Sequence, residues 1–198
     1  MIGVSSFARQ AVAGLRLLLA LTVVLGVLYP GAVLLAGRLA PGRADGSLLR
    51  VDSRVAGSRL IGQSFTGRQW FLPRPSAAGD GYDPLASGAS DLGPENPRLL
   101  AEVQRRRAEI AAREGVQPSD VPADALTASG SGLDPDISPA YAAIQVNRVA
   151  AARGLAPAEV RRLVAAASSP RELGFIGAPA VDVVGLNAAL QALDERRG

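Results

Sequence analysis

An uncharged, mostly apolar stretch at residues 17–37 constrains the fold of this chain more than any other feature. Arg16 precedes the stretch and Arg38 follows it. A helix needs about 20 apolar residues to cross a hydrocarbon core of roughly 30 Å. A lone spanning segment in lipid satisfies its backbone hydrogen bonds only as a helix. The stretch therefore predicts a single transmembrane helix, kinked where Pro30 removes one backbone donor.

Two other interpretations of this stretch stay open on the sequence alone. Arg9 and Arg16, followed by leucines, fit a secretory signal peptide, although the apolar run is not followed by a clean Ala-x-Ala cleavage site before Arg38. A buried helix of a soluble domain is seldom this long without a polar position. With a membrane span, we predict four parts: a tail at 1–16, the span at 17–37, a linker at 38–46 and an extramembrane domain at 47–198.

The remainder of the chain is typical of an α+β domain with a small sheet and about four helices. Asn96 and Ser138 are good N-caps, and each is followed by a proline suited to the first helical position. Short apolar runs bounded by Gly, Ser and Pro predict strands. The expected helices are 97–114, 139–153, 157–167 and 187–193, and the expected strands are 47–53, 60–65, 69–72, 174–176 and 181–184. Trp70 and Phe71 are expected in the core.

Three residue types are absent, and their absence excludes several kinds of chemistry. The 198 residues contain no Cys, His or Lys. Disulfides, Cys/His zinc sites, a Ser-His-Asp triad and the lysine-containing phosphate loop are therefore excluded. After Arg38 the chain has 18 arginines and 18 acidic residues, so its basic surplus belongs to the membrane flanks and not to a nucleic-acid surface.

Two irregular segments, residues 73–96 and 116–138, are rich in small and polar residues that suit contact with a ligand or partner. The candidate binding residues on them are Arg74, Ser76, Tyr82, Asp83, Ser87, Ser90, Asp91, Thr127, Ser129, Ser131 and Asp134, joined by Gln145 and Arg148 on the next helix. The alternative is that these side chains cap turns, and that Arg148 forms an ion pair within the domain. We predict no catalytic residue and no metal site, since Asp134 and Asp136 alone are a poor signal for calcium.

Ordered motifs along the chain resemble the C subunit of the Kdp-type potassium-transporting ATPase, a bacterial membrane complex. After the N-terminal span, they are G-S-x-L-I-G-Q-x-F at 57–65, R-P-S-A at 74–77, Y-x-P at 82–84, S-G-x-S at 87–90, T-A-S-G-S-G-L-D-P-x-I-S-P at 127–139, Q-V-x-R-V-A-x-A-R-G at 145–154 and L-N-x-A-L at 186–190. The chain departs from the family at Asp83, Ala89, Asp91 and Asp136, which puts in doubt any role there that needs an amide or an imidazole.

The resemblance implies a non-catalytic subunit of an ATP-driven, high-affinity potassium uptake complex in the bacterial cytoplasmic membrane. Its implied partners are the channel-like potassium-binding subunit, the P-type ATPase subunit and the lipid bilayer. Nucleic acid is not expected as a partner. It needs no cofactor of its own, because the complex handles ATP and potassium. The expected role is to stabilise assembly and to tune potassium access at the outer face. The alternative is a catalytic chaperone that raises the ATP affinity of the ATPase subunit.

The side of the membrane on which the domain lies separates these two roles. The resemblance places it outside the cytoplasm, whereas a literal positive-inside count, with Arg38, Arg43, Arg50 and Arg54 after the span, favours the inside. That rule is weak for long domains, so we expect the outside. The acidic candidates for shaping the field around potassium are Asp80, Asp83, Asp91, Asp134 and Asp136. A third hypothesis is that the chain is a membrane-anchored hydrolase of envelope substrates, and its only support is the presence of serines in small-residue loops.

Overall fold

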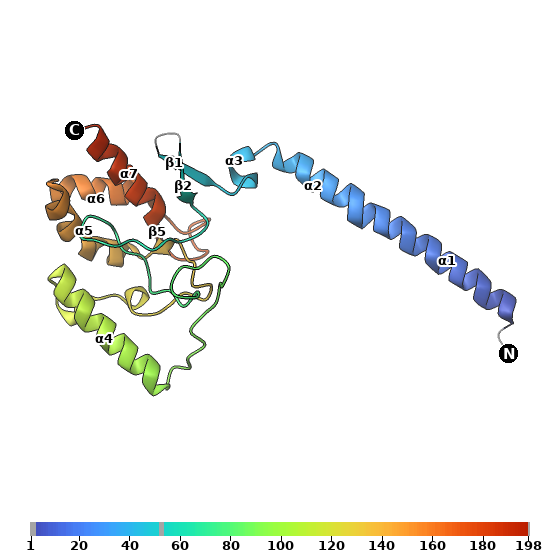
Figure 1. The fold of residues 1–198 in the computed structure, drawn as a ribbon, viewed down its shortest axis with the longest axis horizontal. Coiled ribbons are helices and arrows are strands. Elements are labelled where there is room, and N and C mark those ends of the chain that lie inside the picture. The colour runs from blue at the N-terminus through green and yellow to red at the C-terminus, as the bar shows by residue number, and fades with distance from the viewer. Residues whose placement is uncertain (1–2, 52–53, 198) are drawn as a thin grey trace. The chain divides into compact units, whose positions relative to one another are not determined.

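The computed structural model describes residues 3–51 and 54–197. The chain forms two compact units, Met1–Ser47 and Leu48–Gly198, which are described separately. The first unit contains the apolar N-terminal helix, and the second contains a domain of helices, small sheets and long loops (Figure 1).

The first unit is a long helix followed by a short one. Helix α1 spans Val4–Val23, a π-helical turn spans Val24–Leu28, α2 spans Tyr29–Gly37 and α3 spans Pro41–Ala44. The stretch Ser6–Gly37 has 32 residues and is long and apolar enough to cross a membrane by length and composition. The helix therefore begins well before the predicted span.

Pro30 affects this helix one turn upstream of its own position. A proline has no backbone N–H, so it cannot donate to the carbonyl four residues earlier. The turn before it widens, and the Tyr29 N–H donates to the Val24 carbonyl, five residues back. The predicted disturbance at Pro30 thus takes the form of a π-helical turn, one of the recognised causes of helix irregularity.

The longer helices of the second unit, among the residues that the structure describes, are α4 Pro97–Glu114, α5 Pro139–Arg153, α6 Pro157–Ala166 and α7 Val183–Glu195. The predicted caps are confirmed, because the Asn96 side chain accepts from the Arg98 N–H and the Ser138 side chain accepts from the Tyr141 N–H. Short 3₁₀ turns at Pro118–Asp120 and Ala123–Ala125 lie between α4 and α5. Local capping chemistry is enough to fix where α4 and α5 begin.

The strands form two small antiparallel sheets, which confirms the α+β class. Strands β1 Leu48–Val51 and β2 Arg54–Ser58 make a hairpin whose register shifts between Leu49 and Arg50. The other sheet has the order β3-β5-β4, with β5 in the centre. Its strands are β3 Asp136–Ile137, β4 Ser168–Ser169 and β5 Ala180–Asp182.

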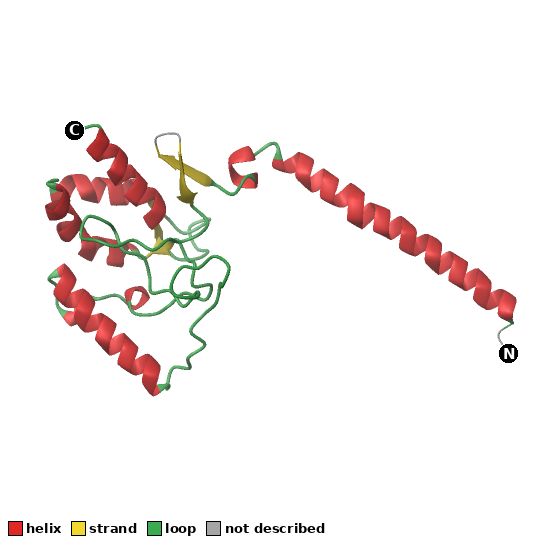
Figure 2. Cartoon of the chain, in the orientation of Figure 1, coloured by secondary structure: helices red, strands yellow, loops and turns green. Residues whose placement is uncertain are grey.

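Several sequence-based boundaries in this unit are wrong. The strand expected at 181–184 ends at Asp182, because the Asp182 carboxylate accepts from the Gly185 N–H at 2.7 Å and starts α7 there. The strands expected at 60–65, 69–72 and 174–176 are loops. Residues 58–96 contain neither a helix nor a strand beyond the end of β2, and Figure 2 shows how much of the domain consists of such loop.

The core of the domain lies among α5, α6, α7 and β5. Val149, Val160, Val181 and Leu186 are fully buried, and so is Phe71 from the long loop. The expectation that Phe71 belongs to the core is confirmed, whereas the same expectation for Trp70 is wrong, because its side chain is only half-buried at the edge of the core. A loop residue at the centre of a helical core needs its backbone polar groups satisfied locally, and that need shapes the candidate site.

Candidate functional site

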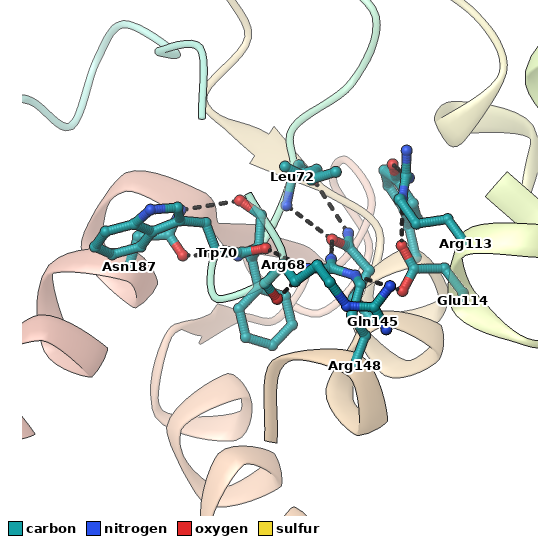
Figure 3. Close-up of polar contacts among 10 residues, drawn as sticks. Arg68, Trp70, Leu72, Arg113, Glu114, Gln145, Arg148 and Asn187 are labelled. Atoms are coloured by element: carbon teal, nitrogen blue, oxygen red, sulfur yellow. Dashed lines mark hydrogen bonds and ion pairs between the residues drawn. The ribbon is translucent and has the colours of Figure 1, made fainter. Parts of the chain in front are cut away.

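The backbone of residues 68–72 forms hydrogen bonds with three side chains, where an extended segment would usually pair with a neighbouring strand (Figure 3). We call these three side chains, Gln145, Arg148 and Asn187, the side-chain clamp. Asn187 accepts from the Phe71 N–H and donates to its carbonyl, both at 2.9 Å. Gln145 accepts from the Leu72 N–H at 2.7 Å and donates to its carbonyl at 3.1 Å. Each amide thus copies the paired hydrogen bonds that a strand would supply.

Arg148 completes the clamp through its fork of donors. One terminal nitrogen donates to the carbonyls of Arg68 at 2.6 Å and Trp70 at 2.9 Å, and the other donates to the Gln145 side chain at 2.7 Å. Its Nε donates to Glu114 at 2.8 Å. The side chains of this pair are 2% and 0% exposed, so the ion pair expected within the domain is confirmed and is buried.

Glu114 lies at the end of α4 and accepts from two arginines. Arg113 donates to Oε1 of Glu114 at 2.7 Å, and Arg148 donates to Oε2 of the same carboxylate at 2.8 Å. Arg113 also donates to the hydroxyl of Tyr141, and burial raises the pKa of Tyr141. A buried carboxylate needs such paired donors, and here the pairing ties α4 to α5.

The Trp70 ring is covered by the side chain of Arg153 from α5. The Arg153 guanidinium lies 4.5 Å from the centre of the Trp70 ring, and its Nε donates to the Gln69 carbonyl at 2.7 Å. The same guanidinium pairs with Asp194 of α7. This cation–π contact closes the loop against the two helices.

A second set of contacts joins the two irregular segments, and we call Arg74, Ser76, Tyr82, Ser87, Ser131, Gly132 and Asp134 the loop junction. Ser76 donates to the Gly132 carbonyl at 2.6 Å, and Ser87 donates to the Ser131 carbonyl at 2.9 Å. Arg74 pairs with Asp134 at 2.9 Å. Candidates from both segments, selected on sequence composition, are therefore brought together.

Tyr82 belongs to the junction through an unusual backbone conformation. Its φ is 58°, in the left-handed region. Its hydroxyl donates to the Arg74 carbonyl at 2.5 Å, and its N–H donates to Ser76 at 2.8 Å. Burial and the nearby charge of Asp134 raise the pKa of Tyr82, so the hydroxyl stays protonated as a donor.

Gly132 carries the closest contact of the junction, and we predict a specific cost for filling it. A Cβ there would lie 2.6 Å from the Gly88 oxygen and 2.7 Å from the Ala78 nitrogen, at a φ of 68°. Gly132→Ala should lower the free energy of unfolding by about 1–3 kcal/mol, because both the clash and the backbone are unfavourable. Urea unfolding of the detergent-solubilised chain, followed by Trp70 fluorescence, measures the loss.

Gly130 is the matched control for that change. A Cβ at Gly130 would meet nothing within 4 Å. Gly130→Ala should shift the free energy of unfolding by no more than about 0.5 kcal/mol. An equal loss in both variants would mean that the junction does not depend on the close approach at Gly132.

The other candidate residues make local contacts or face solvent. Asp83 accepts from the Leu85 N–H at 2.8 Å, and Thr127 donates to the Ala123 carbonyl at 3.1 Å. Ser90 and Asp91 are exposed. Ser129 is buried, and its carbonyl accepts from the Gly132 N–H at 3.2 Å. The turn-capping alternative therefore describes Asp83 and Thr127 well.

Carboxylates gather beside the junction at the small sheet. Asp136 of β3 pairs in register with Asp182 of β5. Burial raises the pKa of Asp136, and the charges of Asp134 and Asp182 raise it further. A pocket of about 270 Å³ beside them is lined by Asp124, Asp134, Asp136 and Arg74, among others. No group of three or more possible metal-ligating residues was found among residues 3–51 and 54–197.

A larger cavity, of about 360 Å³, lies between α4 and the long loop. Four arginines line it, but each of them pairs with a carboxylate. The pairs are Arg74–Asp134, Arg105–Glu109, Arg106–Glu102 and Arg113–Glu114. These pairings largely neutralise the wall of the cavity, and those of Arg105, Arg106 and Arg113 lie within α4 itself. Arg106 also donates to the Leu126 carbonyl at 2.8 Å, which joins α4 to the second irregular segment.

Sequence reasoning missed two residues of this site. The sequence places Asn187 only in the L-N-x-A-L motif and at the start of the helix expected at 187–193, and Glu114 only at the end of the helix expected at 97–114. Both are buried polar side chains in otherwise apolar surroundings, at 1% and 8% exposure. A polar residue on the apolar side of a helix is the signal that could have found them, because buried polar groups need internal partners.

Comparison with known proteins agrees with the family resemblance carried by the sequence motifs, such as the one at 127–139. The profile of the family described as "KdpC: K+-transporting ATPase, c chain" matches residues 11–192. A potassium-transporting ATPase KdpC subunit of Kineococcus radiotolerans is 58% identical over 191 residues, covering 96% of this chain and 97% of the relative. The proteins of the same name from Beijerinckia indica and Mycobacterium tuberculosis are 50% and 48% identical, over 88% and 93% of this chain and 89% and 99% of the relatives. The chain belongs to the KdpC family, the c chain of the K+-transporting ATPase.

Proposed function

We propose that this chain is a non-catalytic subunit that stabilises assembly of the channel-like and P-type ATPase subunits and tunes potassium access at the outer face of the membrane. In the part of the chain that the structure describes, one helix suits a membrane span by length and composition, and a compact domain follows it. The residues that sequence analysis selected for binding are largely used in holding that domain together. Such a domain is suited to present a fixed surface to neighbouring subunits.

The loop junction is the observation that carries the potassium part of the proposal. It ties the segment with Asp80, Asp83 and Asp91 to the segment with Asp134 and Asp136, so five carboxylates belong to one structural unit. Within residues 3–51 and 54–197, Asp134 alone of the five is in an ion pair. A cluster of net negative charge on a low-dielectric surface raises the local concentration of cations.

The test replaces all five carboxylates by amides, in Asp80→Asn, Asp83→Asn, Asp91→Asn, Asp134→Asn and Asp136→Asn. We expect the assembled complex to need about two- to tenfold more potassium for half-maximal ATPase activity at low ionic strength. The difference should shrink in high salt of a non-transported cation, because salt screens exposed charges.

A charge-matched control separates a local field from a change in net charge. It removes five carboxylates outside the two irregular segments, in Glu102→Gln, Glu109→Gln, Glu159→Gln, Glu172→Gln and Glu195→Gln. Its potassium dependence should stay close to that of the parent complex. Equal shifts in the two sets, or no shift in the first, would refute the potassium part of the proposal.

The catalytic-chaperone alternative needs nucleotide contacts from this domain, and the candidates for them are Ser129, Ser131 and Gln145. Gln145 is fully buried and uses its amide on Leu72. Ser131 accepts from the Leu133 N–H at 3.0 Å. The geometry therefore does not favour this alternative, which predicts weaker ATP affinity of the complex when these three side chains are replaced.

A further inference from the structure

The connection between β4 and β5 exposes three large apolar side chains in four residues. Leu173 is 81% exposed, Phe175 is 72% exposed and Ile176 is 50% exposed. We call residues 171–177 the apolar loop. Single exposed hydrophobic residues are common on proteins, but a contiguous group marks an interaction surface.

The apolar loop is fixed in shape before any partner binds. The N–H groups of Gly174, Phe175 and Ile176 donate to carbonyls of Arg171 and Glu172, at 3.1, 3.2 and 2.9 Å. Glu172 and Ile176 form an antiparallel bridge. The loop is therefore a closed turn that holds its apolar side chains outward.

Leu173 occupies a backbone conformation that leucine rarely adopts. Its φ is 51°, in the left-handed region that suits glycine or asparagine. Strain of this kind persists where the surrounding structure enforces it, and it concentrates at functional positions. Here it presents an apolar side chain at the most exposed point of the turn.

We propose that the apolar loop docks into an apolar pocket on another protein subunit of the same complex, a proposal that rests on the assembly role above. A pre-ordered turn gains affinity most against a partner of fixed shape, because little conformational entropy is lost on binding. Covering an aromatic and an aliphatic anchor in such a pocket is worth about tenfold or more in affinity for each side chain.

The charges of the loop favour a protein over a lipid surface as the occupant. Segments that bind anionic bilayers carry clusters of basic residues, whereas this loop has one Arg171 and one Glu172 and no net charge. It also lacks the Trp or Tyr typical of membrane interfaces. A bilayer has no fixed pocket to reward the ordered shape of the turn.

Cysteine protection tests the proposal, because the chain has no cysteine of its own. Phe175→Cys is compared with Leu100→Cys, whose parent side chain on α4 is 57% exposed. The rate of maleimide labelling on this subunit is measured for the full chain alone in detergent and for the purified complex. We expect the complex to slow labelling at Phe175→Cys by about tenfold or more, as for a buried interface centre, and to leave Leu100→Cys nearly unchanged.

Two further arms identify the occupant and separate the two proposals. If the chain alone in phosphatidylethanolamine–phosphatidylglycerol vesicles shows the same protection, the occupant is lipid and the proposal is overturned. If Phe175→Cys is equally reactive in the chain alone and in the complex, it is overturned as well. If the parent chain fails to co-purify with tagged partner subunits, the assembly role itself fails, and that result is distinct from loss of protection.

A second pair of variants tests the energetic role of the loop. Leu173→Asn removes the apolar side chain at a backbone position that asparagine tolerates, and it is combined with Phe175→Ser. The double variant should co-purify with the other subunits at least about fivefold less in stringent detergent washes, as expected for the loss of two anchors, while Leu100→Ser co-purifies normally. If the double variant and Leu100→Ser were recovered with the other subunits in equal amounts, the proposal would be overturned.

Discussion

Replacing Arg148 by methionine is expected to lower the free energy of unfolding of the chain by about 3–5 kcal/mol, because it removes one partner of a buried ion pair. The substitution takes donors away from Glu114, from Gln145 and from the carbonyls of Arg68 and Trp70. Glu114 keeps only Arg113 as a partner. Urea unfolding in detergent, followed by fluorescence of the single tryptophan, measures the loss.

Two controls distinguish the fork of Arg148 from its charge. Arg107→Met removes a positive charge from an exposed position on α4 and should cost no more than about 0.5 kcal/mol. Arg148→Lys keeps the charge, but a single ammonium cannot reach all four acceptors. The free energy of unfolding that Arg148→Lys loses should fall between the losses of Arg107→Met and Arg148→Met. A lysine variant as stable as the parent would show that the charge, and not the fork, stabilises the clamp.

Removal of the Phe71 ring is expected to have a comparable effect for an apolar reason. Phe71 is fully buried although it lies in a loop. Phe71→Ala should cost about 3–5 kcal/mol, from lost burial and from the cavity left behind. Phe175→Ala, at a site 72% exposed in the parent, should cost no more than about 0.5 kcal/mol.

The comparison of these two phenylalanines also bears on the apolar loop. A small loss for Phe175→Ala would show that the ring contributes little to the fold of the free chain. A large loss would mean that Phe175 packs within its own domain, contrary to its exposure. A small loss for Phe71→Ala would contradict the placement of the long loop in the core.

The starts of the main helices could be predicted because the chemistry that fixes them is local. Asn96 and Ser138 cap α4 and α5, and the proline after each side chain suits the first turn. The membrane-length apolar helix was equally clear, since length and hydropathy alone define it. The sequence pattern predicts the start of α7 too late, because Asp182 fits the interior of a strand in that pattern, whereas in the structure it caps the helix.

The loop at residues 68–72 could not be predicted, because its partners are remote in sequence. Its pattern is that of a strand, but its backbone is paired with side chains and not with another strand. Asn187 lies 116 positions from Phe71, and Gln145 lies 73 positions from Leu72. Period and propensity carry no information about such contacts.

The candidate site could be predicted only in part, because its contacts too depend on residues that are remote in sequence. Composition selected the two irregular segments, and the loop junction does join them. Gln145 and Arg148 were selected for their hydrogen-bonding capacity, and that capacity is used inside the domain. Whether a polar group faces a partner or its own chain depends on tertiary packing, which the sequence pattern does not contain.

Topology is the measurement that tests the central claim most directly. Ala86 is exposed in the long loop, and Gly3 is exposed ahead of the apolar helix. Single-cysteine variants Ala86→Cys and Gly3→Cys are expressed with the complex and treated with a membrane-impermeant maleimide in intact and in lysed cells. The account predicts that Ala86→Cys is labelled in intact cells and that Gly3→Cys is labelled only after lysis. The reverse pattern would place the domain in the cytoplasm and contradict a role at the outer face.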